Sequence, residues 1–249
     1  MSVPESQRRP DDSERYEWRL ELPVLWAREQ TRWLSELSEM RGRIIFDKGH
    51  RPSFRRSDGS YADPDPVDAF AFHITARAGG KLVGCARMLR FADAQTDFTQ
   101  SILGAKLGEI LASLGSSVTL SGESGRWIVD PDHRGQTVGR YLMAGVYGVA
   151  QWLGIRTILG WSGTHERQDR AFMSMGWMPV AGFPTFPAPQ FDDEVRLMVF
   201  DVMHMKPVQH ALSVYMTAEL GLEDSPARMI ARQTVSVETS RTGGVWTLS

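Results

Sequence analysis

The chain has 249 residues, of which 42% are hydrophobic and 23% charged, a composition typical of a globular protein rather than a fibrous or disordered one. Its net charge of −2 gives no general attraction to nucleic acid, and its apolar runs are too short to span a membrane. The single cysteine, Cys85, excludes a disulfide within the chain, and the polar N-terminus has no visible signal peptide, so we expect a cytoplasmic protein.

Hydrophobic periodicity predicts an alternation of helices and strands along the chain. Residues 1–17 are expected to be disordered because Arg, Asp, Glu, Ser and Pro dominate them. Residues 41–66 are expected to form a long polar loop, and loops of that length are usually functional or disordered. In chain order the predicted elements are a helix (23–40), two strands joined by a Gly79-Gly80 hairpin turn (69–78 and 81–91), a helix (102–114), a strand (123–129), a helix (138–153), a strand (157–161), a helix (165–175), two strands (177–182 and 195–202) and a helix (212–221).

Helices and strands interleaved in this order are typical of a mixed α/β protein built on one sheet. We therefore expect a disordered segment over 1–17, one α/β domain over 18–210, and a C-terminal helix with a flexible tail over 211–249.

Residues 127–142 combine a strand, a turn containing proline and an amphipathic helix. Arg134 and Gly135 lie in the turn, and Gly139 lies in the first turn of the predicted helix. Such a connection can bind phosphate, because the free backbone N–H groups and the dipole at a helix N-terminus both favour an anion. The alternative is an ordinary connection between a strand and a helix that binds no ligand.

This stretch resembles the acyl-CoA-binding motif of the GNAT N-acyltransferase superfamily, Arg/Gln-x-x-Gly-x-Gly/Ala, with Thr137 in place of the middle glycine. The resemblance implies the GNAT fold, a single central, mostly antiparallel twisted sheet flanked by helices, and an acyl thioester as donor. A Cβ at Thr137 hinders close approach to a pyrophosphate, so the site is expected either to bind acyl-CoA more loosely or to suit the single phosphate of acyl-phosphopantetheine on an acyl carrier protein. The donor is expected to be one of these two. The implied donor-binding residues are Ile128, Val129, Arg134, Gly135, Gln136, Thr137, Val138, Gly139 and Arg140.

Several other segments resemble elements of acyl-homoserine-lactone synthases and bacterial N-acyl amino acid synthases, which are GNAT relatives. Glu123-Ser-Gly-Arg126-Trp127 is similar to their Glu-x-x-Arg-Phe/Tyr element. The shared order of the segments, over residues 20–205, carries the resemblance. The remaining segments are Arg41-Gly-Arg43-Ile-Ile-Phe46, the acidic residues Asp63, Asp65 and Asp68, Val83-Gly84-Cys85-Ala86-Arg87-Met88-Leu89, Arg170-Ala-Phe172 and Gly176-Trp177-Met178.

This second resemblance implies roles for the matching residues. Glu123 and Arg126 are the implied catalytic pair, with Glu123 as the base that takes a proton from an acceptor amine, directly or through water. Arg87 and Arg126 would orient acidic groups through the planar guanidinium fork, and the amide after Val129 would polarise the thioester carbonyl. The alternatives are a structural Glu123–Arg126 pair and structural ion pairs of the two arginines with the aspartates. The implied substrate-binding residues are Arg43, Phe46, Asp63, Asp65, Arg87, Trp127, Trp161 and Phe172.

Two departures from the family pattern bear on the chemistry. Phe172 stands where many GNAT acetyltransferases have the tyrosine that protonates the leaving thiolate. The lactone synthases also tend to lack that hydroxyl, but the tryptophan that shapes their S-adenosylmethionine site, shortly after Phe46, is absent here. The identity of the acceptor therefore stays open.

The segment 41–56 carries six basic residues and has two interpretations. It is either a solvated loop or a docking surface for an acidic acyl carrier protein or for CoA phosphates. The six are Arg41, Arg43, Lys48, Arg51, Arg55 and Arg56.

We therefore expect an N-acyltransferase that moves an acyl group from an acyl thioester to the amine of a small, amino-acid-like acceptor. With S-adenosylmethionine as acceptor, it would make an acyl-homoserine lactone, an autoinducer of quorum sensing. The alternatives are a general acetyl-CoA-dependent N-acetyltransferase and a catalytically silent GNAT-like module that binds a ligand. No metal is expected, because the histidines and Cys85 show no metal-ligand spacing.

Overall fold

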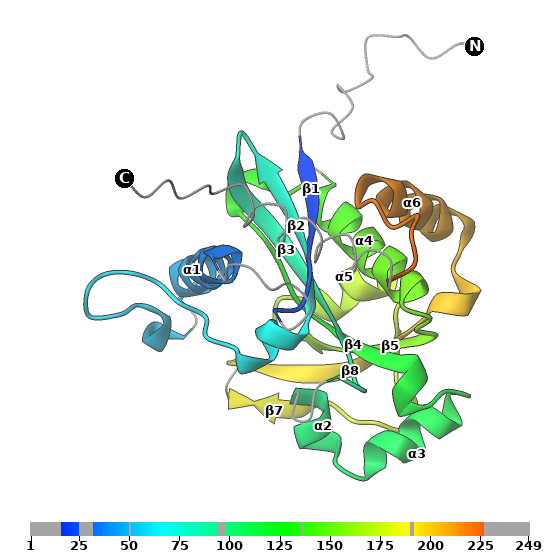
Figure 1. Cartoon of the computed structure of the whole chain (residues 1–249). Helices are drawn as coiled ribbons and strands as arrows, with labels where there is room; N and C mark the ends of the chain where they lie inside the picture. The colour runs from blue at the N-terminus through cyan, green and yellow to red at the C-terminus, as the bar shows by residue number, and fades with distance from the viewer. Residues whose placement is uncertain are drawn as a thin grey trace, which may run out of the picture.

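The computed structural model describes residues 16–24, 32–49, 51–93, 98–135, 137–189 and 192–226. They form one twisted sheet with helices on both faces (Figure 1), which confirms the predicted mixed α/β class. The elements are β1 (Glu17–Glu21), α1 (Arg32–Asp47), β2 (Phe72–Ala78), β3 (Lys81–Arg90), α2 (Phe98–Leu103), α3 (Lys106–Ser113), β4 (Ser121–Val129), α4 (Val138–Trp152), β5 (Thr157–Gly163), α5 (Gln168–Ser174), β6 (Met178–Pro179), β7 (Phe186–Ala188), β8 (Asp193–Asp201) and α6 (Pro207–Glu219).

The strand order of the sheet is β1-β2-β3-β4-β5-β8-β6, with β7 also pairing with β8. Neighbouring strands are antiparallel except for β4 and β5, which are parallel. The sheet is therefore mostly antiparallel, as predicted, and its one parallel pair lies near its centre.

The strands β4 and β5 pair only over their first halves, residues 121–124 with 157–160. Beyond that point β4 continues beside β3 as far as Val129, while β5 continues beside β8 as far as Gly163. The second halves of the two strands thus separate and leave a gap in the middle of the sheet. Backbone groups on the facing edges of the gap are available to a ligand.

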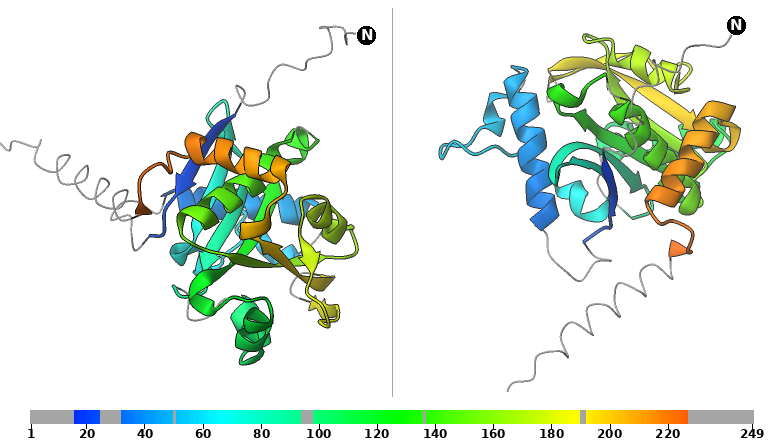
Figure 2. Two further views of the ribbon diagram at one scale, coloured as in Figure 1. Left: turned by 90° about the vertical axis from the view of Figure 1, so that its right-hand side faces the viewer. Right: turned by 90° about the horizontal axis from the view of Figure 1, so that it is seen from above.

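The two faces of the sheet bury different helices. Leu142 and Val146 of α4 pack with Ile74 of β2 in the largest apolar cluster, to which α5 and α6 also contribute. On the other face α1 packs on β3, and α3 packs on β5 and β8. Figure 2 shows α1 and α6 on opposite sides of the sheet. Because helices cover both faces of the sheet, side chains from both helix layers lie around the gap between β4 and β5.

The first helix begins and ends later than predicted. We expected a helix over 23–40 and a loop from residue 41, but α1 runs from Arg32 to Asp47, and residues 25–31 lie outside the described residues. The error has a physical cause at Arg41, a fully buried arginine on the inner face of the helix. Its charge is compensated by ion pairs with Asp63 and Asp68, so it occupies a core position that hydrophobic periodicity reads as polar.

Other elements differ from the prediction in smaller ways. The helix expected over 102–114 is two helices, α2 and α3, divided at Gly104, whose positive φ of 50° ends α2. The short strands β1 and β7 were not predicted, and the strand expected over 177–182 is only β6. β1 begins at Glu17, inside the segment 1–17 that we expected to be disordered; residues 1–15 lie outside the described residues.

The last described helix, α6, begins at Pro207, earlier than the predicted residue 212. Proline suits a first helical turn, since its missing N–H is not needed there. The helix packs on α4 closely enough that a Cβ at Gly148 would lie 2.8 Å from the hydroxyl of Thr217. The flexible tail that we expected lies mainly in residues 227–249, which are outside the described residues. None of the helices described is long and apolar enough to cross a bilayer.

Candidate active site

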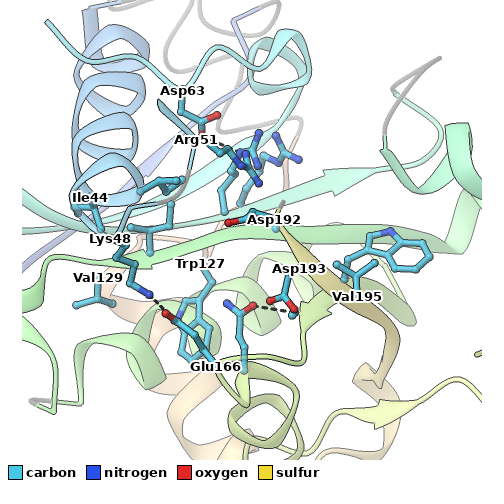
Figure 3. Close-up of a pocket in the computed structure, with 18 of the residues that line it drawn as sticks. Ile44, Lys48, Arg51, Asp63, Trp127, Val129, Glu166, Asp192, Asp193 and Val195 are labelled. Carbon is cyan, nitrogen blue, oxygen red and sulfur yellow. Dashed lines mark hydrogen bonds and ion pairs between the residues drawn. The ribbon is translucent and has the colours of Figure 1, made fainter. Parts of the chain in front are cut away.

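A cavity of about 1150 Å³ opens where β4 and β5 separate. Its walls are the second half of β4, the end of β5, the connection from β4 to α4, and the loops before β2, after β5 and before β8. Figure 3 shows the side chains that line it, with the ion pair of Lys48 and Glu166 joining the α1 side to the loop after β5. A cavity of this size can hold the reacting parts of two substrates.

Arg87 of β3 links the acidic residues of the cavity. Its Nη1 donates to Asp65 at 2.7 Å and to Asp68 at 2.9 Å, and its Nη2 donates to Glu123 at 3.2 Å. Burial alone would lower the pKa of this guanidinium, but the three carboxylates outweigh it and raise the pKa, so Arg87 carries a permanent positive charge.

A second set of ion pairs joins the cavity wall to α1. Arg41 of α1 pairs with Asp63 and Asp68, and Arg126 of β4 pairs with Asp63 at 3.1 Å and with Asp65 at 2.8 Å. Burial would raise the pKa of Asp65, but the charges of Arg87 and Arg126 outweigh it and hold that pKa below its usual value. The lowered pKa values keep Asp65 and Asp68 ionised near neutral pH. These structural ion pairs confirm one of the alternatives that the sequence left open.

Glu123 is held by three donors and still faces the cavity. Its Oε1 accepts from Arg87, and its Oε2 accepts from both the backbone N–H and the hydroxyl of Thr99. A carboxylate has about four lone-pair positions, so one remains for a proton from a substrate or a water. The expected structural pair of Glu123 with Arg126 is wrong, because the cationic partner of Glu123 is Arg87.

The connection from β4 to α4 has two residues with left-handed backbone. Gly135 has a φ of 73° and Thr137 a φ of 63°, both in the left-handed region. Glycine is the usual residue there, and a β-branched side chain in that region is strained. Thr137 thus keeps the backbone shape of the family's glycine.

Gly139 lies under the indole of Trp127. The Trp127 N–H donates to the Gly139 carbonyl at 2.9 Å, and a Cβ at position 139 would lie 2.9 Å from the ring. Glycine is required here because the ring of a cavity-lining tryptophan packs directly on the helix backbone.

The backbone amide that we expected to polarise the thioester carbonyl is already bonded within the sheet. The amide after Val129 belongs to Asp130, and it donates to the carbonyl of Val83 at 2.8 Å. Successive amides of a strand point to opposite sides, so the amide of Val129 itself faces away from β3 and toward the gap. The free donor is therefore one residue earlier than expected.

The structure brings most of the predicted residues to the cavity, but not all. Arg43 pairs with Asp130 at 2.7 Å, Phe46 packs on Tyr61, and Phe172 lies behind Trp127 in the core, so none of the three lines the cavity. Thr137, Val138 and Arg140 also lie outside its lining, and Gln136 is outside the described residues. The predicted residues that line the cavity are Asp63, Asp65, Arg87, Glu123, Arg126, Trp127, Ile128, Val129, Arg134, Gly135, Gly139 and Trp161.

No described tyrosine supplies the hydroxyl group that is absent at Phe172. None of the described tyrosines lines the cavity. Tyr147 is buried, accepts from the Trp177 N–H at 2.9 Å and donates to the Met175 carbonyl, and burial raises its pKa. The leaving thiolate must therefore take its proton from another source.

The six basic residues near α1 do not form one surface. Arg41 is buried and Arg43 is bound to Asp130, while Arg55 and Arg56 are exposed. Lys48 and Arg51 line the cavity.

Sequence reasoning did not find Thr99. It lies at the start of α2, outside every recognisable motif, and only the fold brings it to Glu123. It also missed Ser124, His165, Asp192 and Asp193, which line the cavity.

Comparisons with known proteins agree with this fold. The acetyltransferase (GNAT) domain family matches residues 48–144, a range that includes β3, β4 and the start of α4. A search of curated protein sequences finds no match to this chain.

Several solved structures are similar over most of the chain. BjaI, a CoA-dependent acyl-homoserine lactone synthase with SAM and isopentyl-CoA, has a TM-score of 0.57 and 17% identity, covering 88% of this chain and 99% of its own. MesI, also a CoA-dependent acyl-homoserine lactone synthase, has a TM-score of 0.53 and 19% identity, with 84% and 97% covered. The AHL synthase LasI has a TM-score of 0.53 and 11% identity, with 78% and 92% covered.

At these identities the structural likeness establishes the fold, and the family match adds the sequence signature of the domain. The separated strands and the connection from β4 to α4 lie within or beside the matched residues. The sequence and the fold thus agree: residues 48–144 match the acetyltransferase (GNAT) domain, and the chain has the fold of these acyltransferase structures.

Proposed function

We propose that the protein transfers an acyl group from an acyl thioester to the amine of a small, positively charged, amino-acid-like acceptor. The observation that carries this proposal is an imbalance of charge in the ion-pair network beside the cavity. The ion-pair network joins four carboxylates, Asp63, Asp65, Asp68 and Glu123, to three guanidinium groups, those of Arg41, Arg87 and Arg126.

The network therefore carries one excess negative charge. His73, which faces Asp68, does not offset it, because burial lowers the pKa of His73 to about 4. The other charged residues of the lining are four cations (Lys48, Arg51, Arg134 and Arg167) and three carboxylates (Glu166, Asp192 and Asp193), so the negative excess is confined to the network. A buried excess charge is costly, and an ammonium group in the cavity would compensate it. Asp65 and Arg126, with side chains 14% and 17% exposed, are the members most open to such an acceptor.

The chemical step uses Glu123 and the thioester. The acceptor ammonium gives a proton to the free lone pair of Glu123, directly or through one water, and becomes a neutral amine. The amine nitrogen attacks the thioester carbonyl, the C–N bond forms, and the C–S bond breaks. The sulfur leaves as a thiolate and takes the second proton lost by the nitrogen, and Glu123 returns its proton to solvent.

The amide of Val129 would stabilise the oxyanion that forms on the carbonyl. It faces the gap between β4 and β5, where a donor can lie beside the developing charge. The proposed reaction has no covalent intermediate on Cys85. Burial raises the pKa of this thiol to about 12, and Cys85 does not line the cavity.

An acyl-CoA is the favoured donor. Arg134 and Gly135 line the cavity beside the start of α4, where a phosphate would meet the helix N-terminus. The similar BjaI and MesI structures are described as CoA-dependent, which supports the same donor here. An acyl carrier protein remains the second donor, with the exposed Arg55 and Arg56 as its contacts.

Acyl-homoserine-lactone synthesis is this reaction with S-adenosylmethionine as the acceptor, followed by a second step. In that step the carboxylate oxygen of the acceptor attacks its own carbon next to the sulfonium, the C–O bond forms, the C–S bond breaks and methylthioadenosine leaves. The cationic preference of the cavity supports it, as does the likeness to BjaI, whose structure contains SAM. An N-acyl amino acid is the product if the acceptor is an amino acid instead.

The test is a matrix of donors and acceptors with the purified protein, read by thiol release and by mass spectrometry of the products. Acetyl-, isopentyl- and octanoyl-CoA would be combined with S-adenosylmethionine, with amino acids and with an uncharged amine. We expect amide formation with a cationic acceptor. Transfer to the uncharged amine alone would contradict the charge argument, and no thiol release with any pair would favour a silent binding module.

A further inference from the structure

Trp161 lines the cavity on the α2 side of the sheet, next to Phe98. It lies on β5 just beyond the last pair with β4, two residues after Leu159, the partner of Glu123. Its side chain thus shares a face with that of Glu123. Its ring contacts Phe98, Phe183 and Phe186 in edge-to-face geometry, with centroids 5.5, 5.9 and 5.2 Å away. These contacts hold the indole in one orientation.

Thr99 connects this ring to Glu123 by hydrogen bonds whose direction is fixed. The indole N–H of Trp161 can only donate, and it donates to the Thr99 hydroxyl oxygen at 2.8 Å. The Thr99 hydroxyl has one proton, and it donates that proton to Oε2 of Glu123. The backbone N–H of Thr99 donates to the same oxygen at 3.2 Å.

Thr99 itself is fully buried. A continuous series of hydrogen bonds therefore begins at the cavity wall, at Trp161, passes through Thr99 and ends at the carboxylate of Glu123.

We propose that Thr99 is a positioning residue for Glu123, and that through Thr99 the acyl-binding wall formed by Trp161 sets the geometry of the base. The proposal rests on the function proposed above. The thioester carbonyl must lie near Glu123 for the amine to transfer its proton there, so the acyl chain extends past Glu123 along the same face. Trp161 is the lining residue that it meets there.

The hydrogen bonds from Trp161 through Thr99 to Glu123 have two consequences for substrate choice. A short or flat acyl group fits against the ring and leaves the hydrogen bonds in place. A longer chain must displace the indole, which pulls on the Thr99 hydroxyl and turns Glu123 away from the amine. Acyl selectivity should then appear in kcat as well as in KM, since the displaced ring impairs the base after the donor has bound.

Three variants separate positioning from simple structural support. Thr99→Val keeps the shape and the backbone amide but removes the hydroxyl. Thr99→Ser keeps the hydroxyl, and Trp161→Phe keeps a ring but removes the N–H. Each would be compared with the wild type for kcat, donor KM, the pH profile of kcat and the melting temperature, with the best donor and acceptor pair.

For Thr99→Val we expect kcat to fall roughly tenfold or more with little change in donor KM, a smaller loss than the roughly 10²–10⁴ that removal of a general base costs. The acidic limb of its pH profile should move, and Thr99→Ser should recover most of the activity. Trp161→Phe combined with Thr99→Val should lose no more than Thr99→Val alone, because one broken link already interrupts the chain.

Chain length provides the second measurement. Trp161→Leu removes the wall and opens the cavity toward Phe183 and Phe186. The ratio of kcat/KM for octanoyl-CoA to that for isopentyl-CoA should rise about tenfold, a change of about 1.4 kcal/mol in transition-state binding.

Glu123→Gln in the same assay distinguishes failure of this proposal from failure of the proposed function. If Glu123→Gln is inactive while Thr99→Val keeps the wild-type kcat and pH profile, the positioning role is overturned and the base stands. A Thr99→Ser variant as impaired as Thr99→Val would also overturn it. If Glu123→Gln is fully active, the base assignment fails and the positioning role fails with it.

Discussion

The indole N–H of Trp127 donates to the carbonyl of Gly139 at 2.9 Å, so a cavity-lining residue of β4 is bonded to the first turn of α4. This contact joins the wall of the cavity to the helix whose N-terminus would bind the phosphate of the proposed donor. It also explains why position 139 is a glycine, since a Cβ there would lie 2.9 Å from the indole.

Substitution of Gly139 by alanine should move Trp127 and weaken donor binding. We expect a several-fold rise in donor KM and a loss of about 1–3 kcal/mol in unfolding free energy, typical of overpacking. Gly108→Ala is the matched control, because a Cβ at Gly108 in α3 meets no atom and should stabilise that helix by about 0.5–1 kcal/mol. Steady-state kinetics and urea unfolding measure both effects. Unchanged KM in Gly139→Ala would show that the Trp127 position does not affect the donor.

Thr137 offers a test of which donor the phosphate site fits. Its φ of 63° is strained for a β-branched residue, so Thr137→Gly should release about 1–3 kcal/mol of strain, partly offset by the backbone entropy of glycine. Without the Cβ, the backbone can approach a pyrophosphate more closely. We expect a lower KM for acyl-CoA but an unchanged KM for acyl-pantetheine, which carries no phosphate. Equal changes for both donors would count against a pyrophosphate at this turn.

His73 should make the stability of the protein depend on pH in a defined window. Burial lowers its pKa from 6.5 to about 4, although Asp68 opposes the shift; Arg41 and Arg87 add to it. The folded pKa is below the unfolded one, so the folded state binds fewer protons. Stability is therefore complete above pH 6.5 and falls as the pH drops toward 4, by about 3 kcal/mol at 1.36 kcal/mol per pKa unit.

Urea unfolding between pH 8 and pH 4 measures this effect, with His73→Asn as the comparison. The variant should be less stable at pH 8, but its stability should change little over the same window. The comparison with His73→Asn separates this effect from titration of the carboxylates, because both proteins carry the same carboxylates and only the wild type carries His73. Parallel pH profiles for the wild type and the variant would contradict the buried, neutral state of His73.

The sequence predicted the parts of the fold in which local pattern and tertiary burial agree. The hairpin of β2 and β3, and the helix α4 with its apolar face, follow directly from periodicity. Arg41 interrupts that pattern. Its partners lie 22 and 27 residues away along the chain, so local periodicity predicts a surface position for this buried arginine. The start and end of α1 could therefore not be predicted locally.

The candidate site was predicted where a motif carries it, and missed where only the fold assembles it. Glu123, Arg126 and Gly139 belong to motifs and line the cavity. Thr99 supports Glu123 from 24 residues away and has no signature of its own. Arg43 and Phe46 match a family segment but lie on α1 away from the cavity, because a match of residue types does not fix which side of a helix faces the substrate.

The central claim is that Glu123 accepts the proton of the acceptor amine, and the kcat of Glu123→Gln tests it most directly. Glutamine keeps the size of the side chain and its hydrogen-bond acceptor oxygen but cannot take up the proton. With the best donor and a saturating acceptor, we predict a fall in kcat of roughly 10²–10⁴, with the donor KM nearly unchanged and the melting temperature close to that of the wild type. A folded Glu123→Gln protein that turns over at the wild-type rate would contradict the claim.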